Sequence, residues 1–163
     1  MKNKTLFLVM FCVTVAGCAA VSRAPAPPPA KEIRSPHQSS EALLVTLMAL
    51  GVDYRNGGRS AATGFDCSGL VAHVFEEAYG IRLPRTALGQ SETGFSVSAH
   101  ELQPGDLVFY DTLDRPYSHV GIYIGEGKFV HAPKTGAAVR VESLKTSYWT
   151  KRFNGARRID PSL

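Results

Sequence analysis

The sequence predicts an α+β fold, in which helices come first and strands of a mostly antiparallel sheet come afterwards. Apolar residues between 41 and 80 recur at the spacing of amphipathic helices. The chain after residue 106 instead alternates short runs rich in Val, Ile, Phe and Tyr with glycine-containing turns. This order is typical of folds whose helices pack on one side of an antiparallel sheet. Residues 41–163 are close in number to the commonest domain size, about 100–150 residues, so we expect one domain there.

The first predicted helix begins at Glu41, with Ser40 as its N-cap, and ends at Gly51. Its apolar residues are Leu43, Leu44, Leu47, Met48 and Leu50. A glycine-rich loop, residues 54–58, is expected to follow.

The second predicted helix carries the single cysteine of the predicted domain. We expect Asp66 to cap this helix and Gly80 to end it. At 100° per residue, Cys67 falls near the middle of the apolar face, in the first helical turn. The thiol should therefore point toward the core. A short third helix is expected near residues 86–92.

The second and third of five predicted strands form a hairpin that carries two histidines. The strands are residues 107–111, 119–124, 128–132, 138–142 and 152–159. The connection Gly125-Glu126-Gly127 fits a three-residue loop, with a glycine in the left-handed conformation. This register places His119 and His131 on one face as diagonal neighbours, roughly 7–8 Å apart at Cα. A two-residue loop would place them on opposite faces.

We expect the Cys67 helix to pack on this histidine-bearing face, where Gly121 and Gly125 leave room. The helix N-terminus and His119 would then lower the pKa of the thiol from about 8.5. His131 would hold the His119 ring in the productive tautomer. A lone cysteine on an apolar helix face is usually a small core residue, but this combination favours a nucleophile. A zinc site with the same three ligands is the alternative.

The N-terminal 40 residues have the pattern of a signal peptide and a tether. Residues 1–17 begin with a basic segment and continue with an apolar run too short for the roughly 20 residues that span a bilayer. Small residues directly before Cys18 resemble the lipobox of bacterial lipoproteins, which predicts a lipidated Cys18. An ordinary secretory signal without lipid is the alternative.

The predicted lipid would anchor the domain without a transmembrane helix, because two acyl chains already give stable membrane attachment. Residues 18–40 are rich in Pro and Ala and form the predicted linker. In the polyproline II conformation, this linker reaches roughly 70 Å. Ala19 is not the Asp that resembles an inner-membrane retention signal. We therefore expect an outer-membrane protein that faces the periplasm, with outer-membrane lipid as a partner.

The charge of the chain argues against nucleic acid as a partner. The formal net charge is +4 and falls to +2 when Lys2 and Lys4 are removed with the signal peptide. Four basic residues gather near the C-terminus: Lys151, Arg152, Arg157 and Arg158. We interpret them as a solvated edge; a site for an anionic glycan or peptide is the alternative. We expect a monomer that uses neither a metal nor a cofactor.

Several ordered motifs resemble those of the NlpC-type cell-wall cysteine peptidases. They are Phe65-Asp66-Cys67-Ser68-Gly69-Leu70-Val71, Leu83-Pro84-Arg85-Thr86, residues 102–109 (LQPGDLVF), residues 119–125 (HVGIYIG) and Phe129-Val130-His131-Ala132. The resemblance extends from about residue 41 to residue 159. It implies a papain-like domain that hydrolyses amide bonds of peptidoglycan stem peptides.

The resemblance also implies roles for individual residues. Cys67 resembles the nucleophile, His119 the base and His131 the third polar member. Tyr54 resembles a tyrosine near the oxyanion position, although a packed loop aromatic would look the same. Asp66 and Ser68 correspond to positions that contact the substrate peptide, or they serve only as helix caps.

The resemblance implies two candidate bonds for cleavage. The lipoprotein relatives act on bonds of meso-diaminopimelate, either the D-alanyl cross-link or the γ-D-glutamyl bond within a stem. We favour an endopeptidase that opens the cross-link. A tethered module that binds peptidoglycan without cutting it is a further alternative.

Overall fold

The computed structural model describes residues 36–161. The predicted signal peptide (1–17), Cys18 and the linker up to residue 35 lie outside the described residues. Within the described part of the chain, no helix has both the length and the apolar character needed to cross a membrane.

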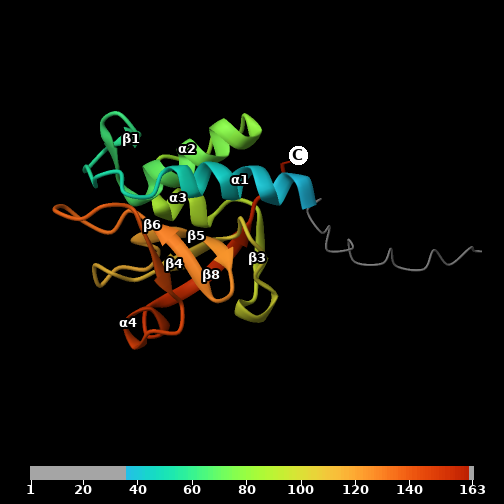
Figure 1. Ribbon diagram of the computed structural model, residues 1–163. Helices are drawn as coiled ribbons and strands as arrows, with labels where there is room; N and C mark the ends of the chain where they lie inside the picture. Colours follow the sequence, from blue (N-terminus) through green and yellow to red (C-terminus); the bar gives the residue numbers. More distant parts are fainter. Residues whose placement is uncertain (1–35, 162–163) are drawn as a thin grey trace, which may run out of the picture. The chain divides into compact units, whose positions relative to one another are not determined.

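Three helices lie together on one side of the main sheet (Figure 1). They are α1 (Pro36–Met48), α2 (Cys67–Tyr79) and α3 (Ala87–Ser91). A fourth short helix, α4 (Ser147–Thr150), lies on the other side, and a 3-10 turn, η1, covers Ala99–Glu101. The sequence did not predict α4 or η1.

The main sheet has six strands in the order β3-β8-β4-β5-β6-β7, and every neighbouring pair is antiparallel. The strands are β3 (Phe95–Val97), β4 (Leu107–Tyr110), β5 (His119–Gly125), β6 (Lys128–His131), β7 (Arg140–Ser143) and β8 (Phe153–Arg158). A separate small hairpin pairs β1 (Arg59–Ser60) with β2 (Gly64–Phe65). The predicted α+β class is confirmed; β1, β2 and β3 were not predicted.

Helix α1 begins earlier than the sequence predicted. Its first residue is Pro36, so the chain is already helical at Ser40, and the prediction that Ser40 caps the helix is wrong. Proline fits the first helical position because its fixed φ suits a helix and no amide hydrogen is needed there. Gly51 follows the helix with a φ of 81°, and its N–H donates to the Val139 carbonyl at 2.9 Å. This bond ties the end of α1 to the segment before β7.

The predicted boundaries of α2 are confirmed. Asp66 has extended backbone angles, and its Oδ1 accepts a hydrogen bond from the Gly69 N–H at 2.7 Å. At the other end, Gly80 has a φ of 68°, and its N–H donates to the Glu76 carbonyl at 2.8 Å. These bonds satisfy backbone groups that a helix terminus leaves unpaired.

The sheet is buried on both faces. Helix α2 packs Leu70, Val71, Val74 and Phe75 against one face, in a core that includes Val120 and Ile122 of β5. The other face has a second core, formed by Val97, Val108, Tyr110, Phe129, Trp149 and Ala156. Residues at alternate positions of one strand therefore lie in different apolar environments.

The β5–β6 hairpin has the predicted register but not the predicted turn. Ile122 lies opposite Val130, as expected, whereas Lys128 lies opposite Gly125. Residues 126 and 127 have φ values of 52° and 70°, which is the pattern of a two-residue type I′ turn. An irregularity just before this turn shifts the pairing by one residue. This bulge restores the register that a two-residue turn alone would have changed.

The basic residues near the C-terminus do not form the predicted solvated edge. Arg158 is buried, and its Nε and Nη2 donate to the two carboxylate oxygens of Asp106 at 2.8 and 2.7 Å. Arg157 donates from Nε to the Ser91 carbonyl. Arg152 instead lies over the Tyr148 ring, 4.0 Å from its centroid. Three of the four side chains therefore make separate structural contacts, whereas Lys151 is exposed. A buried charge like that of Arg158 requires such a partner.

Candidate active site

Cys67 is the first residue of α2, and its partly buried thiol lies against the start of β5. The backbone N–H groups of Val120, Ser68 and Cys67 itself lie near the sulfur and favour its ionised form. The two helix amides are available because the first turn of a helix leaves its N–H groups without intrahelical acceptors. The predicted orientation of the thiol toward the core is confirmed.

The electrostatic environment of Cys67 differs from the sequence-based expectation of a lowered pKa. Burial raises the pKa of the thiol, and the negative charge of Asp66 raises it further. The N–H groups of Val120 and Ser68 lower the pKa but do not offset these effects. At neutral pH the resting group is therefore the thiol.

His119 and His131 form a hydrogen-bonded pair at the end of the β5–β6 hairpin. His119 Nε2 lies 2.7 Å from His131 Nδ1, and the two rings are nearly perpendicular at 87°. Both side chains are buried. The prediction that the two histidines project from the same face of the sheet is confirmed.

The Cys67 helix does not pack on this face, so that part of the prediction is wrong. The two imidazoles lie on the side of the second core, and the Trp149 ring stacks on His119 at 5.7 Å between centroids. A Cβ at Gly121 would lie 2.5 Å from the Phe129 ring. The space that glycine leaves is therefore filled by the hairpin's own phenylalanine. The thiol instead lies beside the backbone of Val120, the residue that follows His119.

Burial keeps both imidazoles neutral. It lowers the pKa of His119 from 6.5 to about 4. Burial also lowers the pKa of His131, and the charges of His119 and Arg140 add to this effect. Arg140 lies opposite His131 in the pairing of β6 with β7. In the neutral pair, the N–H of one ring donates a hydrogen bond to the unprotonated nitrogen of the other. His131 Nε2 has no hydrogen-bond partner among the described residues.

The Asp66 carboxylate is the most heavily hydrogen-bonded group near the thiol. In addition to the Gly69 N–H, it accepts hydrogen bonds from the Gly57 N–H at 3.0 Å, the Ser68 hydroxyl at 3.3 Å and the Arg85 guanidinium. Burial opposes ionisation of Asp66, but Arg85 and the two backbone amides outweigh it and hold its pKa below the ordinary value. The predicted cap is confirmed, whereas the proposed contact of Asp66 with substrate stays a prediction.

Arg85 is a member of this site that the residue-by-residue reasoning did not single out. Its Nη1 donates to Asp66 at 3.0 Å and to the Ser68 hydroxyl at 2.9 Å, so it binds both residues that flank Cys67. Gln90 holds the Arg85 segment in place, because its Nε2 donates to the carbonyls of Ser68 and Pro84. Arg85 and Asp66 are 19 residues apart in the sequence, and the motif that contains Arg85 was the available signal.

Tyr54 belongs to the same group of side chains. Burial raises the pKa of its hydroxyl, and so do the negative charge that Cys67 gains when it ionises and the charge of Asp66. Its loop lies directly on the first turn of α2, since a Cβ at Gly69 would be only 2.0 Å from the Gly58 carbonyl oxygen. Tyr54, Asp66, Cys67, Ser68 and Arg85 therefore form one polar cluster at the N-terminus of α2.

The geometry of the histidines also bears on the zinc alternative. Within residues 36–161, no group of three or more His, Cys, Asp or Glu side chains is placed to hold a metal ion. The nitrogen atoms of His119 and His131 that face each other are 2.7 Å apart, which leaves no room for an ion between them.

The fold, the polar cluster around Cys67 and the buried histidine pair on the neighbouring hairpin together define a class of protein. Residues 51–158 match the model of the NlpC/P60 family, so the chain belongs to that family. The resemblance to NlpC-type proteins in the sequence motifs is thereby confirmed.

Curated relatives include several bacterial cell-wall enzymes. The murein DD-endopeptidase MepS/murein LD-carboxypeptidase of Escherichia coli (strain K12) is 48% identical over 109 residues, which cover 67% of this chain and 56% of that protein. The murein DD-endopeptidase MepH of the same organism is 42% identical over 116 residues, covering 69% of this chain and 43% of that protein. The chain thus spans about half the length of these relatives.

A solved structure supports the same conclusion about the fold. An NLP/P60-family protein of Staphylococcus aureus, described as similar to lipoprotein, has a TM-score of 0.71 and 32% identity. The match covers 82% of this chain and 45% of that one.

The histidine pair predicts a specific dependence of folding stability on pH. As pH falls below 6.5, unfolded chains bind protons at both histidines, whereas folded His119 stays neutral until about pH 4. The free energy of unfolding should therefore decrease between pH 6.5 and 4, by roughly 3 kcal/mol for His119 alone. Urea denaturation at a series of pH values measures this.

The matched controls use substitutions to glutamine. The double variant His119→Gln/His131→Gln should flatten the decrease between pH 6.5 and 5, whereas His100→Gln, which changes an exposed histidine, should leave it unaltered. A wild-type protein whose stability does not change over this range would contradict the prediction.

Proposed function

We propose that this protein is a cysteine endopeptidase that hydrolyses amide bonds of peptidoglycan stem peptides. The observation that carries the proposal is the Cys67 thiol beside the backbone of Val120, the residue that follows His119, which forms a buried hydrogen-bonded pair with His131. Relatives named murein endopeptidases support peptidoglycan as the substrate.

In the proposed mechanism, His119 acts as the general base. Its Nε2 is hydrogen-bonded to His131 Nδ1, so His119 Nδ1 is the nitrogen that remains to accept the thiol proton. The Cys67 sulfur attacks the carbonyl carbon while its proton moves to His119. Because burial makes the thiol a weak acid and the imidazole a weak base, attack and proton transfer occur together rather than from a preformed ion pair.

The second half of the reaction returns both groups to their starting states. His119 gives its proton to the departing amine, and the bond between carbon and nitrogen breaks to leave a thioester on Cys67. Water then attacks this acyl enzyme, with His119 taking the water proton, and the thiol is restored. Throughout the cycle, His131 accepts a hydrogen bond from His119 Nε2 and fixes the ring orientation.

Backbone and phenol groups stabilise the negative charge on the tetrahedral intermediate. The N–H of Cys67 favours the ionised form of the sulfur, and Tyr54 lies close enough for ionised Cys67 to raise its pKa. Both are donors at the place where the oxyanion would form. Ser68 and Asp66 contact the substrate peptide next to this position, with Arg85 holding them in place.

We favour the D-alanyl cross-link as the bond that is cleaved. The two Escherichia coli relatives named DD-endopeptidases support this choice. The γ-D-glutamyl bond is a second candidate, because the gamma-DL-glutamyl hydrolase of Bacillus subtilis is 42% identical over 112 residues, covering 68% of this chain and 27% of that protein.

Digestion of purified muropeptides tests the activity and the bond together. Wild-type protein should separate cross-linked dimers into monomers, whereas Cys67→Ala should lose this activity by at least about a thousandfold, because no other thiol is available among the described residues. Mass spectrometry identifies the products. Products cut only between D-Glu and diaminopimelate would overturn the preference for the cross-link, and an active Cys67→Ala protein would overturn the mechanism.

Two substitutions at His131 test its role as a positioning residue. Asparagine retains an acceptor for the His119 Nε2–H, whereas leucine removes it at similar volume. His131→Leu should lower kcat by about 10²–10⁴-fold with little change in KM, and His131→Asn should recover most of the loss. Kinetics with a cross-linked muropeptide, alongside thermal unfolding of each variant, measure this. Equal losses in two folded variants would contradict the role.

We also propose that the mature protein is a lipoprotein of the outer membrane, facing the periplasm, with Cys18 as the lipidated residue. The pattern of residues 1–18 supports this proposal. Mass spectrometry of the mature N-terminus should find an acylated Cys18, and globomycin should cause the uncleaved precursor to accumulate. An unmodified Cys18 would contradict the proposal, and Cys18→Ala provides the control.

A further inference from the structure

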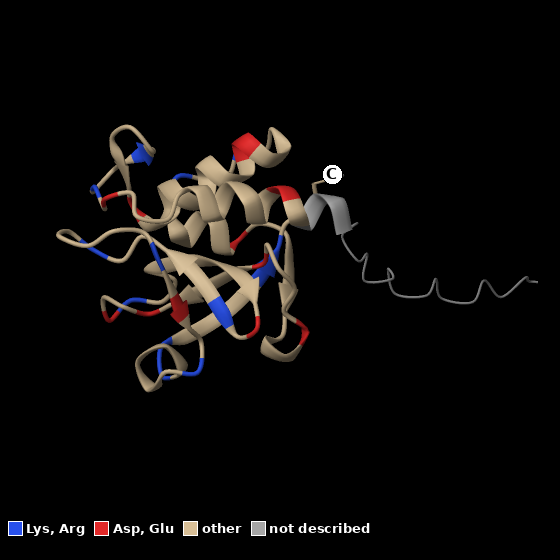
Figure 2. Cartoon of the chain, in the orientation of Figure 1, with Lys and Arg blue, Asp and Glu red and all other residues tan. Residues whose placement is uncertain are grey.

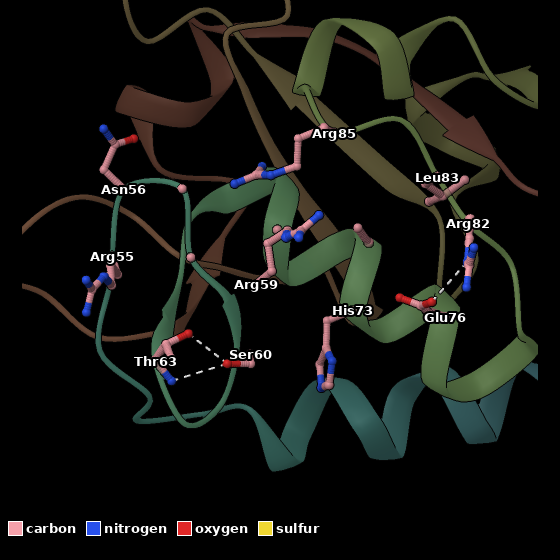
Figure 3. Close-up of a pocket in the computed structure, with 14 residues that line it drawn as sticks. Arg55, Asn56, Arg59, Ser60, Thr63, His73, Glu76, Arg82, Leu83 and Arg85 are labelled. Atoms are coloured by element: carbon pink, nitrogen blue, oxygen red, sulfur yellow. Dashed lines mark hydrogen bonds and ion pairs between the residues drawn. The ribbon is translucent and has the colours of Figure 1, made fainter.

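A recess lies along the outer side of α2, away from the histidine pair. It has a volume of about 850 Å³ and is bounded by α2, the loop that carries β1 and β2, and the segment from Arg82 to Arg85. Figure 3 shows these three segments around the recess, with Arg59 and Arg85 on the side of the first turns of α2. We call this recess the arginine pocket.

The arginine pocket has an excess of positive charge. Four arginines line it, Arg55, Arg59, Arg82 and Arg85, against a single lining carboxylate, Glu76. Glu76 is paired with Arg82 at 3.2 Å, and Arg85 is bound to Asp66 (Figure 3). Within residues 36–161, neither Arg55 nor Arg59 forms an ion pair with a carboxylate. Figure 2 shows that the β1–β2 segment carries basic residues at this corner of the domain.

Glycines let the backbone segments around the pocket pack closely against one another. A Cβ at Gly58 would lie 2.3 Å from the Gly64 carbonyl oxygen, and a Cβ at Gly69 would lie 2.0 Å from that of Gly58. Gly57 has a φ of 75°, which favours glycine. These contacts fix the loop backbone on α2, and the exposed side chains of Arg55 and Arg59 extend from its two ends.

The pocket begins next to the proposed nucleophile. Gly69, which lines the pocket, is two residues from Cys67, and Arg85 binds both neighbours of Cys67. The lining then follows α2 to Glu76, about 10 Å farther at 1.5 Å per residue. An extended peptide covers this length with about three residues. A stem peptide that is held at Cys67 and passes around the N-terminus of α2 would place the residues next to its scissile bond at the Arg85 end of the pocket.

We propose that the arginine pocket binds free carboxylates of the stem peptide, and that Arg55 and Arg59 make the enzyme selective for stems in which these groups are not amidated. This inference rests on the proposed function. Stem peptides carry carboxylates on D-glutamate and on diaminopimelate, within a few residues of either candidate bond. A guanidinium group matches a carboxylate with two parallel hydrogen bonds, which a neutral amide cannot accept in the same way.

Binding measurements with Cys67→Ala protein test this inference without relying on catalysis. The probes are the tetrapeptide L-Ala-γ-D-Glu-diaminopimelate-D-Ala and the same peptide with both stem carboxylates amidated. Calorimetry should give a Kd for the free peptide that is at least tenfold lower than for the amidated one. Adding Arg55→Gln and Arg59→Gln should raise the Kd of the free peptide about tenfold or more and remove the preference. Added salt should weaken binding of the free peptide in the parent protein, because exposed charges are screened.

Matched controls separate pocket binding from net charge. Lys151→Gln removes one exposed positive charge outside the pocket and should leave both Kd values unchanged. Inorganic phosphate should compete only weakly; phosphate that displaces the peptide at equal concentration would mark a general anion site and overturn the assignment. Equal affinity for the two peptides, unchanged affinity in the double arginine variant, or no binding of the free peptide would each overturn the inference.

These outcomes are distinguishable from a failure of the proposed function. Loss of the carboxylate preference in binding would leave muropeptide cleavage by the wild-type protein intact. An inactive wild-type protein that still binds the free peptide through Arg55 and Arg59 would instead support the carboxylate-binding pocket and overturn the proposed peptidase activity.

Discussion

The Asp66 carboxylate is the group on which the arrangement of the site depends. It caps α2 through Gly69, holds the preceding loop through Gly57, and pairs with Arg85 from the segment that follows α2. One buried charge thus joins three segments around Cys67. Because each donor stabilises the ionised carboxylate, the same contacts that hold its pKa low also fix the geometry of the thiol. A neutral residue at this position could cap the helix but could not hold Arg85 in the same way.

Burial of the sheet on both faces supplies the second constraint. The apolar residues of α2 cover one face, and an aromatic cluster with Trp149 covers the other, where the imidazoles lie. Desolvation there makes the neutral forms of His119 and His131 the stable ones. The histidine pair is therefore held by its hydrogen bond and by ring packing rather than by charge. Burial on the α2 side of the sheet likewise makes thiolate formation at rest unfavourable for Cys67.

In the β5–β6 hairpin, the predicted strand register is right although the predicted turn type is wrong. Glycines at positions 125 and 127 indicated a tight reversal but did not distinguish a three-residue loop from a two-residue turn with a bulge. Both solutions keep Ile122 and Val130 in the core, and burial of these side chains selects the register. Apolar alternation thus specified the shared face of His119 and His131, whereas the turn geometry adapted to it.

The sequence by itself determined the fold class, both ends of α2, the hairpin register and the thiol at a helix start, because these features depend on short-range hydrogen bonds and on apolar periodicity. Only the tertiary structure decided which face of the sheet α2 covers, that Arg85 binds Asp66, and that Trp149 stacks on His119. These contacts join residues far apart in the chain, and no local preference encodes which distant side chain will meet which. The direction of the Cys67 pKa shift followed from the same packing, since a helix N-terminus favours the thiolate while burial favours the thiol.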